Sequence, residues 1–80
     1  MCRQVKINLQ GLSLGRLTSD EARKLIMEIR GIELVEFEPG EREAVIVGNT
    51  SLNSPDEILR AILEAKLKFS RYYLTEQSYD

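Results

Sequence analysis

The fold of this chain is decided by residues 3–21, which read RQVKINLQGLSLGRLTSDE. Apolar and polar side chains alternate over residues 3–10, and this period of two is typical of a strand with one buried face. The TSDE sequence is a capping box, in which the Thr18 hydroxyl accepts a hydrogen bond from the Glu21 amide and the Glu21 carboxylate accepts one from the Thr18 amide. The stretch therefore predicts a strand, a connection over residues 11–17 and the start of a helix.

The rest of the chain continues to alternate strands and helices. Ser19 is an alternative cap for the first helix, which Gly31 ends by supplying a left-handed residue. Extended segments are expected over residues 32–38 and 41–48, joined by a turn at Pro39-Gly40. A second capping box, SPDE, begins a helix at residues 54–57, and the aromatic run over residues 67–74 predicts a last strand.

This order of strand, helix, strand, strand, helix and strand predicts a ferredoxin-like α+β sandwich, with a four-stranded antiparallel sheet and both helices on one face. Eighty residues leave room for one core, so we expect residues 1–80 to form a single ferredoxin-like domain. The other face of the sheet then has no cover from within the domain.

The third expected strand contributes apolar side chains to that open face. Residues 44–47 read AVIV, so one alternate pair must point away from the helices in either register. Together with a leucine of the second strand and one of two adjacent tyrosines, that pair would form an apolar patch. The alternative is that these are isolated surface side chains of the ordinary kind. The candidate interaction residues are Leu34, Val45, Val47, Tyr72 and Tyr73.

The composition argues against several classes of function. The chain has 11 Lys and Arg against 13 Asp and Glu, whereas proteins that bind nucleic acid by neutralising phosphates usually have a basic excess. It contains no histidine, which is the commonest general base and metal ligand. Cys2 has no second cysteine to pair with, and no apolar run is long enough for a membrane span or a signal peptide. We therefore expect a cytoplasmic protein without a cofactor.

The order of motifs resembles the heavy-metal-associated domains of copper chaperones and metal-pumping ATPases, over roughly residues 4–73. Those domains have a first strand, a Gly-Met-x-Cys-x-x-Cys loop, a helix that ends in Gly-Val, a hairpin and a second helix. The connection over residues 11–17 aligns with the loop, and Gly31-Ile32 aligns with the end of the helix. The two ligand positions hold Leu14 and Leu17.

A leucine side chain has no lone pair that could replace a thiolate on a soft metal. The resemblance therefore implies a degenerate member of the family without metal binding. We expect Leu12, Leu14 and Leu17 to close the top of the core instead.

Two other functions remain open. Residues 10–16 also resemble the phosphate cradle of acylphosphatases, in which backbone amides and one arginine hold the anion, and this implies Gly11, Gly15 and Arg16 as anion-binding residues. That family also uses an asparagine on the strand after the first helix, where residues 32–38 have none. RNA-recognition domains share the fold, but they stack bases on aromatic residues of the two central strands, and the first and third strands expected here carry none.

The sequence thus favours a small non-catalytic module for dimerisation or protein–protein interaction. The expected partner is a second copy of the chain or another protein, bound at the open face of the sheet or at the edge of the last strand. An enzyme, a membrane protein, a nucleic-acid binder and a metal carrier are all disfavoured.

Overall fold

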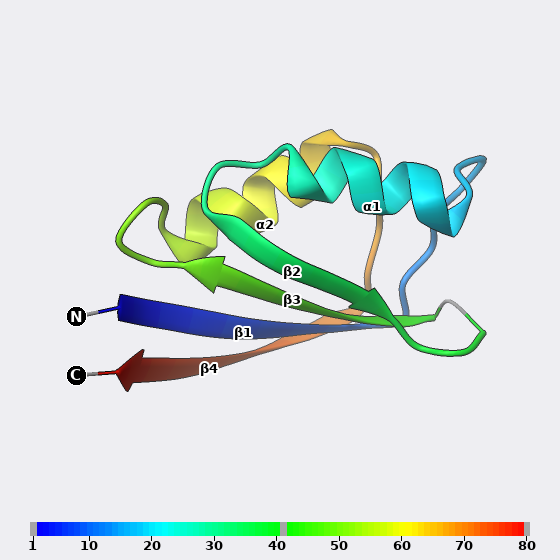
Figure 1. The fold of residues 1–80 in the computed structure, drawn as a ribbon. Helices are drawn as coiled ribbons and strands as arrows, with labels where there is room; N and C mark the ends of the chain where they lie inside the picture. Colours follow the sequence, from blue (N-terminus) through cyan, green and yellow to red (C-terminus); the bar gives the residue numbers. More distant parts are fainter. Residues whose placement is uncertain (1, 41, 80) are drawn as a thin grey trace.

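The computed structural model describes residues 2–40 and 42–79. Within them, the elements along the chain are β1 (Cys2–Gln10), α1 (Ser19–Met27), β2 (Ile32–Phe37), β3 (Glu43–Asn49), α2 (Pro55–Glu64) and β4 (Arg71–Tyr79). The strands form one antiparallel sheet in the order β2-β3-β1-β4, and both helices lie on the same side of it (Figure 1). This is the ferredoxin-like α+β fold that the sequence predicts.

Both helices begin where their caps predict. Thr18 Oγ1 accepts a hydrogen bond from the Glu21 N–H at 3.2 Å, and Glu21 Oε1 accepts one from the Thr18 N–H at 3.2 Å. At α2, Ser54 Oγ accepts from the Glu57 N–H at 3.2 Å, and Pro55 occupies the first turn. Among the described residues, the hydrogen bond from the Glu57 N–H to Ser54 is present, whereas the return bond from the Ser54 N–H to the Glu57 carboxylate is not, so half of the predicted capping box forms. These contacts satisfy amides that the helix itself cannot pair.

The end of α1 differs from the prediction. The helix stops at Met27 and is capped by Glu28, whose N–H donates to the carbonyls of Lys24 and Ile26. Gly31, with φ of +87°, lies in the turn that leads into β2 rather than at the end of the helix. The sequence thus predicts the left-handed conformation of Gly31 correctly, but it places this residue at the end of α1 instead of in the turn before β2.

The start of the last strand also differs from the prediction. Residues 67–70 belong to the connection between α2 and β4, and Leu67 in this connection is fully buried in the core. Lys68 there forms a bridge with Ser13, whose N–H donates to the Lys68 carbonyl at 2.7 Å. Strand β4 begins at Arg71 and extends to Tyr79.

The core fills the space between the sheet and the helices. Val5, Ile7 and Leu9 of β1 are fully buried, as the alternation of that strand predicts. Leu12 and Leu14 are buried beside them, and Leu17 packs against the same cluster, so the leucines of the connection close the core as expected. The other large, fully buried side chains come from α1, β3, α2 and the segment after it, and they are Ile26, Ile46, Ile58, Ile62 and Leu67.

The connection between β1 and α1 is held against two other parts of the chain. The Leu12 N–H donates to the Arg42 carbonyl at 2.8 Å, next to the start of β3, while Ser13 bonds to the segment before β4. Gly11 makes this path possible, because its φ is +66° and a Cβ at this position would overlap the Ser70 side chain. The connection is thus part of the packed end of the sheet.

This packing predicts different costs for two glycine substitutions. Gly15 has a similar φ of +63°, but a Cβ there would meet nothing within 4 Å. Gly15→Ala should therefore cost only the left-handed backbone, about 1–2 kcal/mol. Gly11→Ala should cost about 1–3 kcal/mol more, because it also overpacks the contact with Ser70. Urea unfolding followed by circular dichroism measures both, and equal losses would contradict the contact.

Candidate functional site

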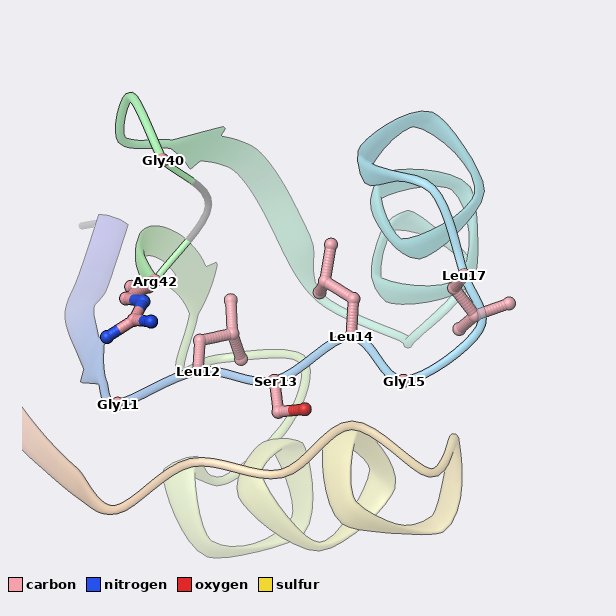
Figure 2. Close-up of a pocket in the computed structure, with 8 residues that line it drawn as sticks. All are labelled: Gly11, Leu12, Ser13, Leu14, Gly15, Leu17, Gly40 and Arg42. Carbon is pink, nitrogen blue, oxygen red and sulfur yellow. The ribbon is translucent and has the colours of Figure 1, made fainter.

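The first candidate site is a depression beside the connection over residues 11–17. It encloses about 510 Å³ between this connection and the β2–β3 turn (Figure 2). The residues that line it are Gly11, Leu12, Ser13, Leu14, Gly15, Leu17, Gly40 and Arg42.

The depression contains two of the three residues expected for an anion site. Gly11 and Gly15 line it, whereas Arg16 is exposed and is not part of the lining. The arginine in the lining is Arg42, whose side chain lies near Gly11 and the end of β1 in Figure 2. Sequence reasoning did not single out Arg42, because the β-sheet pairing brings it to the connection from thirty residues away.

Three amides of the connection are paired within the protein itself. The N–H groups of Leu12 and Ser13 donate to backbone carbonyls, and the Leu17 N–H donates to the Leu14 carbonyl at 3.1 Å. A phosphate cradle needs such amides to point at the anion. Those three amides do not point at such an anion, and Arg16, the arginine of the acylphosphatase-like alternative, lies outside the depression.

The former ligand positions of the metal-binding resemblance hold core side chains. Leu14 is buried and Leu17 packs on the core cluster. Among residues 2–40 and 42–79, no three His, Cys, Asp or Glu side chains come together in an arrangement that could hold a metal ion. The side chain of Cys2 lies outside the described ones. None of the described helices has the length and apolar character needed to cross a membrane.

The second candidate site is the face of the sheet that points away from the helices. Residues directly opposite each other on neighbouring strands point to the same face. Val47 pairs with Leu34 on β2 and with Lys6 on β1, while Asn8 pairs with Val45 and with Tyr73. The apolar residues of this open-face patch are therefore Leu34, Val45, Val47 and Tyr73.

The register also separates the two tyrosines that the sequence left as alternatives. Tyr72 lies opposite the buried Leu9, so it points to the helix side of the sheet, where its ring meets that of Phe69 edge-on at 5.9 Å and 87°. Tyr73 belongs to the open-face patch and is 51% exposed. Four of the five candidate interaction residues thus share one face, and Tyr72 does not.

Charged side chains border the patch at several points. By register, Lys6 lies beside Val47, Glu36 beside Val45, and Arg71 opposite Gln10. All three charged side chains are exposed. An apolar centre with a charged margin of both signs is the usual anatomy of a protein–protein interface.

Asn8 is an unusual feature at the centre of the open face. Its side-chain oxygen Oδ1 is buried and has no hydrogen-bond partner among the described residues. It lies in one row between Val45 and Tyr73. A buried acceptor without a donor costs about 1–3 kcal/mol. A hydrogen-bond donor that reached this oxygen would remove the cost.

The central strands of the sheet are β3 and β1, and neither carries an aromatic residue. Tyr73 lies on the edge strand β4. The stacking platform that RNA-recognition domains place on their central strands is thus missing from these two strands.

The position of Asn8 predicts a stabilising substitution. Asn8→Val removes the unpaired acceptor and should raise the free energy of unfolding by about 1 kcal/mol. Gln10→Val is the matched control, because Gln10 is a half-buried amide on the same strand and face. Denaturant unfolding at low protein concentration compares them. Equal gains would show that strand propensity alone explains the effect.

Comparison of the chain with models of protein families, with curated proteins and with solved structures gave no match in any of the three. The likeness to heavy-metal-associated domains therefore rests on the order of motifs along the sequence.

Proposed function

We propose that this chain is a small non-catalytic interaction module, which associates with itself as a homodimer and presents the open face of its sheet to protein contact. The observation that carries the proposal is the open-face patch. It places Leu34, 43% exposed, and Tyr73 on either side of two half-buried valines, around an acceptor that lacks a donor. Contiguous exposed apolar surface of this kind is typical of association sites.

The size of the protein supports the same proposal. A chain of 80 residues buries only about 60–65% of the surface that its unfolded form exposes, so its own core provides modest stability. Burial of a second apolar surface against another chain adds to that stability by mass action. Association thus raises the free energy of unfolding in addition to forming the functional contact.

The chemistry of the chain supports a module without catalysis. The chain contains no histidine, and the loop that carries metal ligands in heavy-metal-associated domains presents leucines to the core. In the connection that would serve as a phosphate cradle, the amides of Leu12, Ser13 and Leu17 donate within the protein, and Arg16 lies outside the depression. The open-face patch is therefore the feature to which we assign the function, and it acts by binding the surface of another protein chain.

The proposal predicts that the wild-type chain exceeds its monomer mass at tens of micromolar in analytical ultracentrifugation. Leu34→Lys and Val47→Lys should each lower the weight-average mass at the highest concentrations, because they introduce a charge into the open-face patch. The association constant should fall about tenfold or more. A monomer at all concentrations, with stability and solubility unchanged in both variants, would overturn the proposal.

Leu63→Lys is the matched control for these variants. Leu63 lies on α2 and is 52% exposed, so the substitution introduces the same charge at a similar leucine away from the open face. Its weight-average mass should match that of the wild type. An equal fall in the weight-average mass of Leu63→Lys would mean that the added charge weakens association through general repulsion between copies.

A further inference from the structure

The two edges of the sheet differ in how well they are protected against pairing with another strand. Strand β2 is short, has an irregularity in register between Ile32 and Leu34, and carries the exposed acids Glu33 and Glu36. Strand β4 pairs with β1 without a break from Arg71 to Tyr79. Bulges, charges and proline are the usual devices that prevent edge-to-edge pairing. Edge β2 has two of them. Edge β4 pairs with β1 without a bulge, and between its exposed charges Arg71 and Glu76 residues 72–75 contain neither a charge nor a proline.

The backbone of β4 has hydrogen-bonding groups that point to the free edge. The Arg3 carbonyl accepts from the Thr50 N–H at 2.9 Å on the β3 side, and the Gln10 carbonyl accepts from the Ser70 N–H at 2.9 Å on the β4 side. In an antiparallel ladder these directions alternate along the strand, so Asn8 and the other even-numbered residues of β1 bond to β4.

The register then identifies the outward-pointing residues of β4. Tyr73 and Thr75 lie opposite Asn8 and Lys6, so their backbone groups bond to β1. The N–H and carbonyl groups of the alternate residues point to the free edge. Those residues are Tyr72, Leu74, Glu76 and Ser78.

The side chains of the same residues are exposed on the helix side of the sheet. Tyr72 and Leu74 lie opposite the buried Leu9 and Ile7, yet they are 48% and 42% exposed. The helices therefore leave this part of β4 uncovered, at the margin of the sheet in Figure 1. Unpaired backbone groups and uncovered apolar side chains occur together on one strand.

We infer that β4 pairs antiparallel with β4 of a second copy, about a two-fold axis that passes through Leu74, and so extends the sheet to eight strands. This inference rests on the self-association in the proposed function. It assigns the dimer to the edge of β4, and the open-face contact adds to the association at the highest concentrations. An axis perpendicular to the sheet keeps each face on its own side. Leu74 then lies opposite the partner's Leu74, Tyr72 opposite the partner's Glu76, and Tyr73 opposite the partner's Thr75.

The register centred on Leu74 pairs the outward backbone groups of Tyr72, Leu74 and Glu76 with those of the partner. Each of the pairs formed by Tyr72, Leu74 and Glu76 exchanges two hydrogen bonds, about six in total. A register centred on Tyr73 would pair Tyr72 with the partner's Leu74 alone and give about four. A register centred on Thr75 would also use Ser78 and give about eight, but it would place Leu74 opposite the partner's Glu76 instead of the partner's Leu74. The Leu74 register also places apolar side chains of both copies next to one another on the helix side.

Charge and symmetry favour a second copy over other arrangements. In this register no two like charges lie opposite each other, and the Tyr72 hydroxyl can donate to the carboxylate of the partner's Glu76. The formal net charge of −2 gives little repulsion between copies. Pairing of β4 with β2 of another copy would meet the bulge and the acids of β2, and it would leave a free β4 at the end of an open chain.

A charge-swap experiment at Leu74 tests both the edge and the register. Leu74→Lys and Leu74→Glu each place like charges opposite one another on the two-fold axis, so each variant alone should sediment as a monomer at concentrations where the wild type is a dimer. Their dimerisation should be weakened about tenfold or more. An equimolar mixture places opposite charges on the axis and should restore a mass of twice 9.2 kDa.

A backbone variant serves as a second test. Leu74→Pro removes an N–H that points to the free edge and leaves the bonds to β1 in place, so it should give a monomer with an unchanged circular dichroism spectrum. Leu74→Val keeps the N–H and should remain a dimer. If Leu74→Pro does not fold, the charge-swap mixture decides the question alone.

The outcomes separate this inference from the proposed function. Dimers that persist in Leu74→Lys and Leu74→Glu but are lost in Leu34→Lys would place the dimer contact on the open face and overturn the edge pairing. Monomers that remain monomeric in the mixture would overturn the register. Restored dimers in the mixture, with no effect of Leu34→Lys or Val47→Lys on association, would support the edge pairing and count against the open face.

Discussion

The burial of Val5, Ile7 and Leu9 on one face of β1 is the constraint on which the rest of the structure depends. Strand β1 is central, so its alternation fixes the register of β3 on one side and of β4 on the other. A shift by one residue would turn every apolar side chain of β1 to solvent. The same alternation places Asn8 between Val45 and Tyr73 on the opposite face. The core and the candidate contact surface are thus two consequences of one pattern.

Local signals in the sequence predicted most of the elements. The capping box at Thr18 and the cap at Ser54 identify the starts of both helices, because each depends on hydrogen bonds within four residues. The start of β4 was harder to predict. Leu67 and Phe69 resemble strand residues, but Leu67 is buried in the core and the bridge from Ser13 to Lys68 holds the segment as a connection. That bridge joins residues far apart in sequence.

The candidate site was predictable to a similar extent. The apolar run at residues 44–47 required an exposed pair in either register, and the structure selects Val45 and Val47. The choice between Tyr72 and Tyr73 depends on the register with β1, which the sequence of β4 does not encode. The buried oxygen of Asn8 follows from its neighbours across the sheet, although the alternation of β1 had already assigned Asn8 to the open face.

The leucines of the connection have a consequence for how this fold can change over evolutionary time. Replacing Leu14 and Leu17 by cysteines would supply thiolates, but Leu14 is buried and the connection is bonded on both sides, to Arg42 and to Lys68. The new thiols would have to leave the core before they could share a metal ion with a delivery partner, and the core would lose the packing that they replaced. Metal transfer would thus need a released loop as well as new ligands. Single substitutions in this leucine loop therefore mainly cost stability.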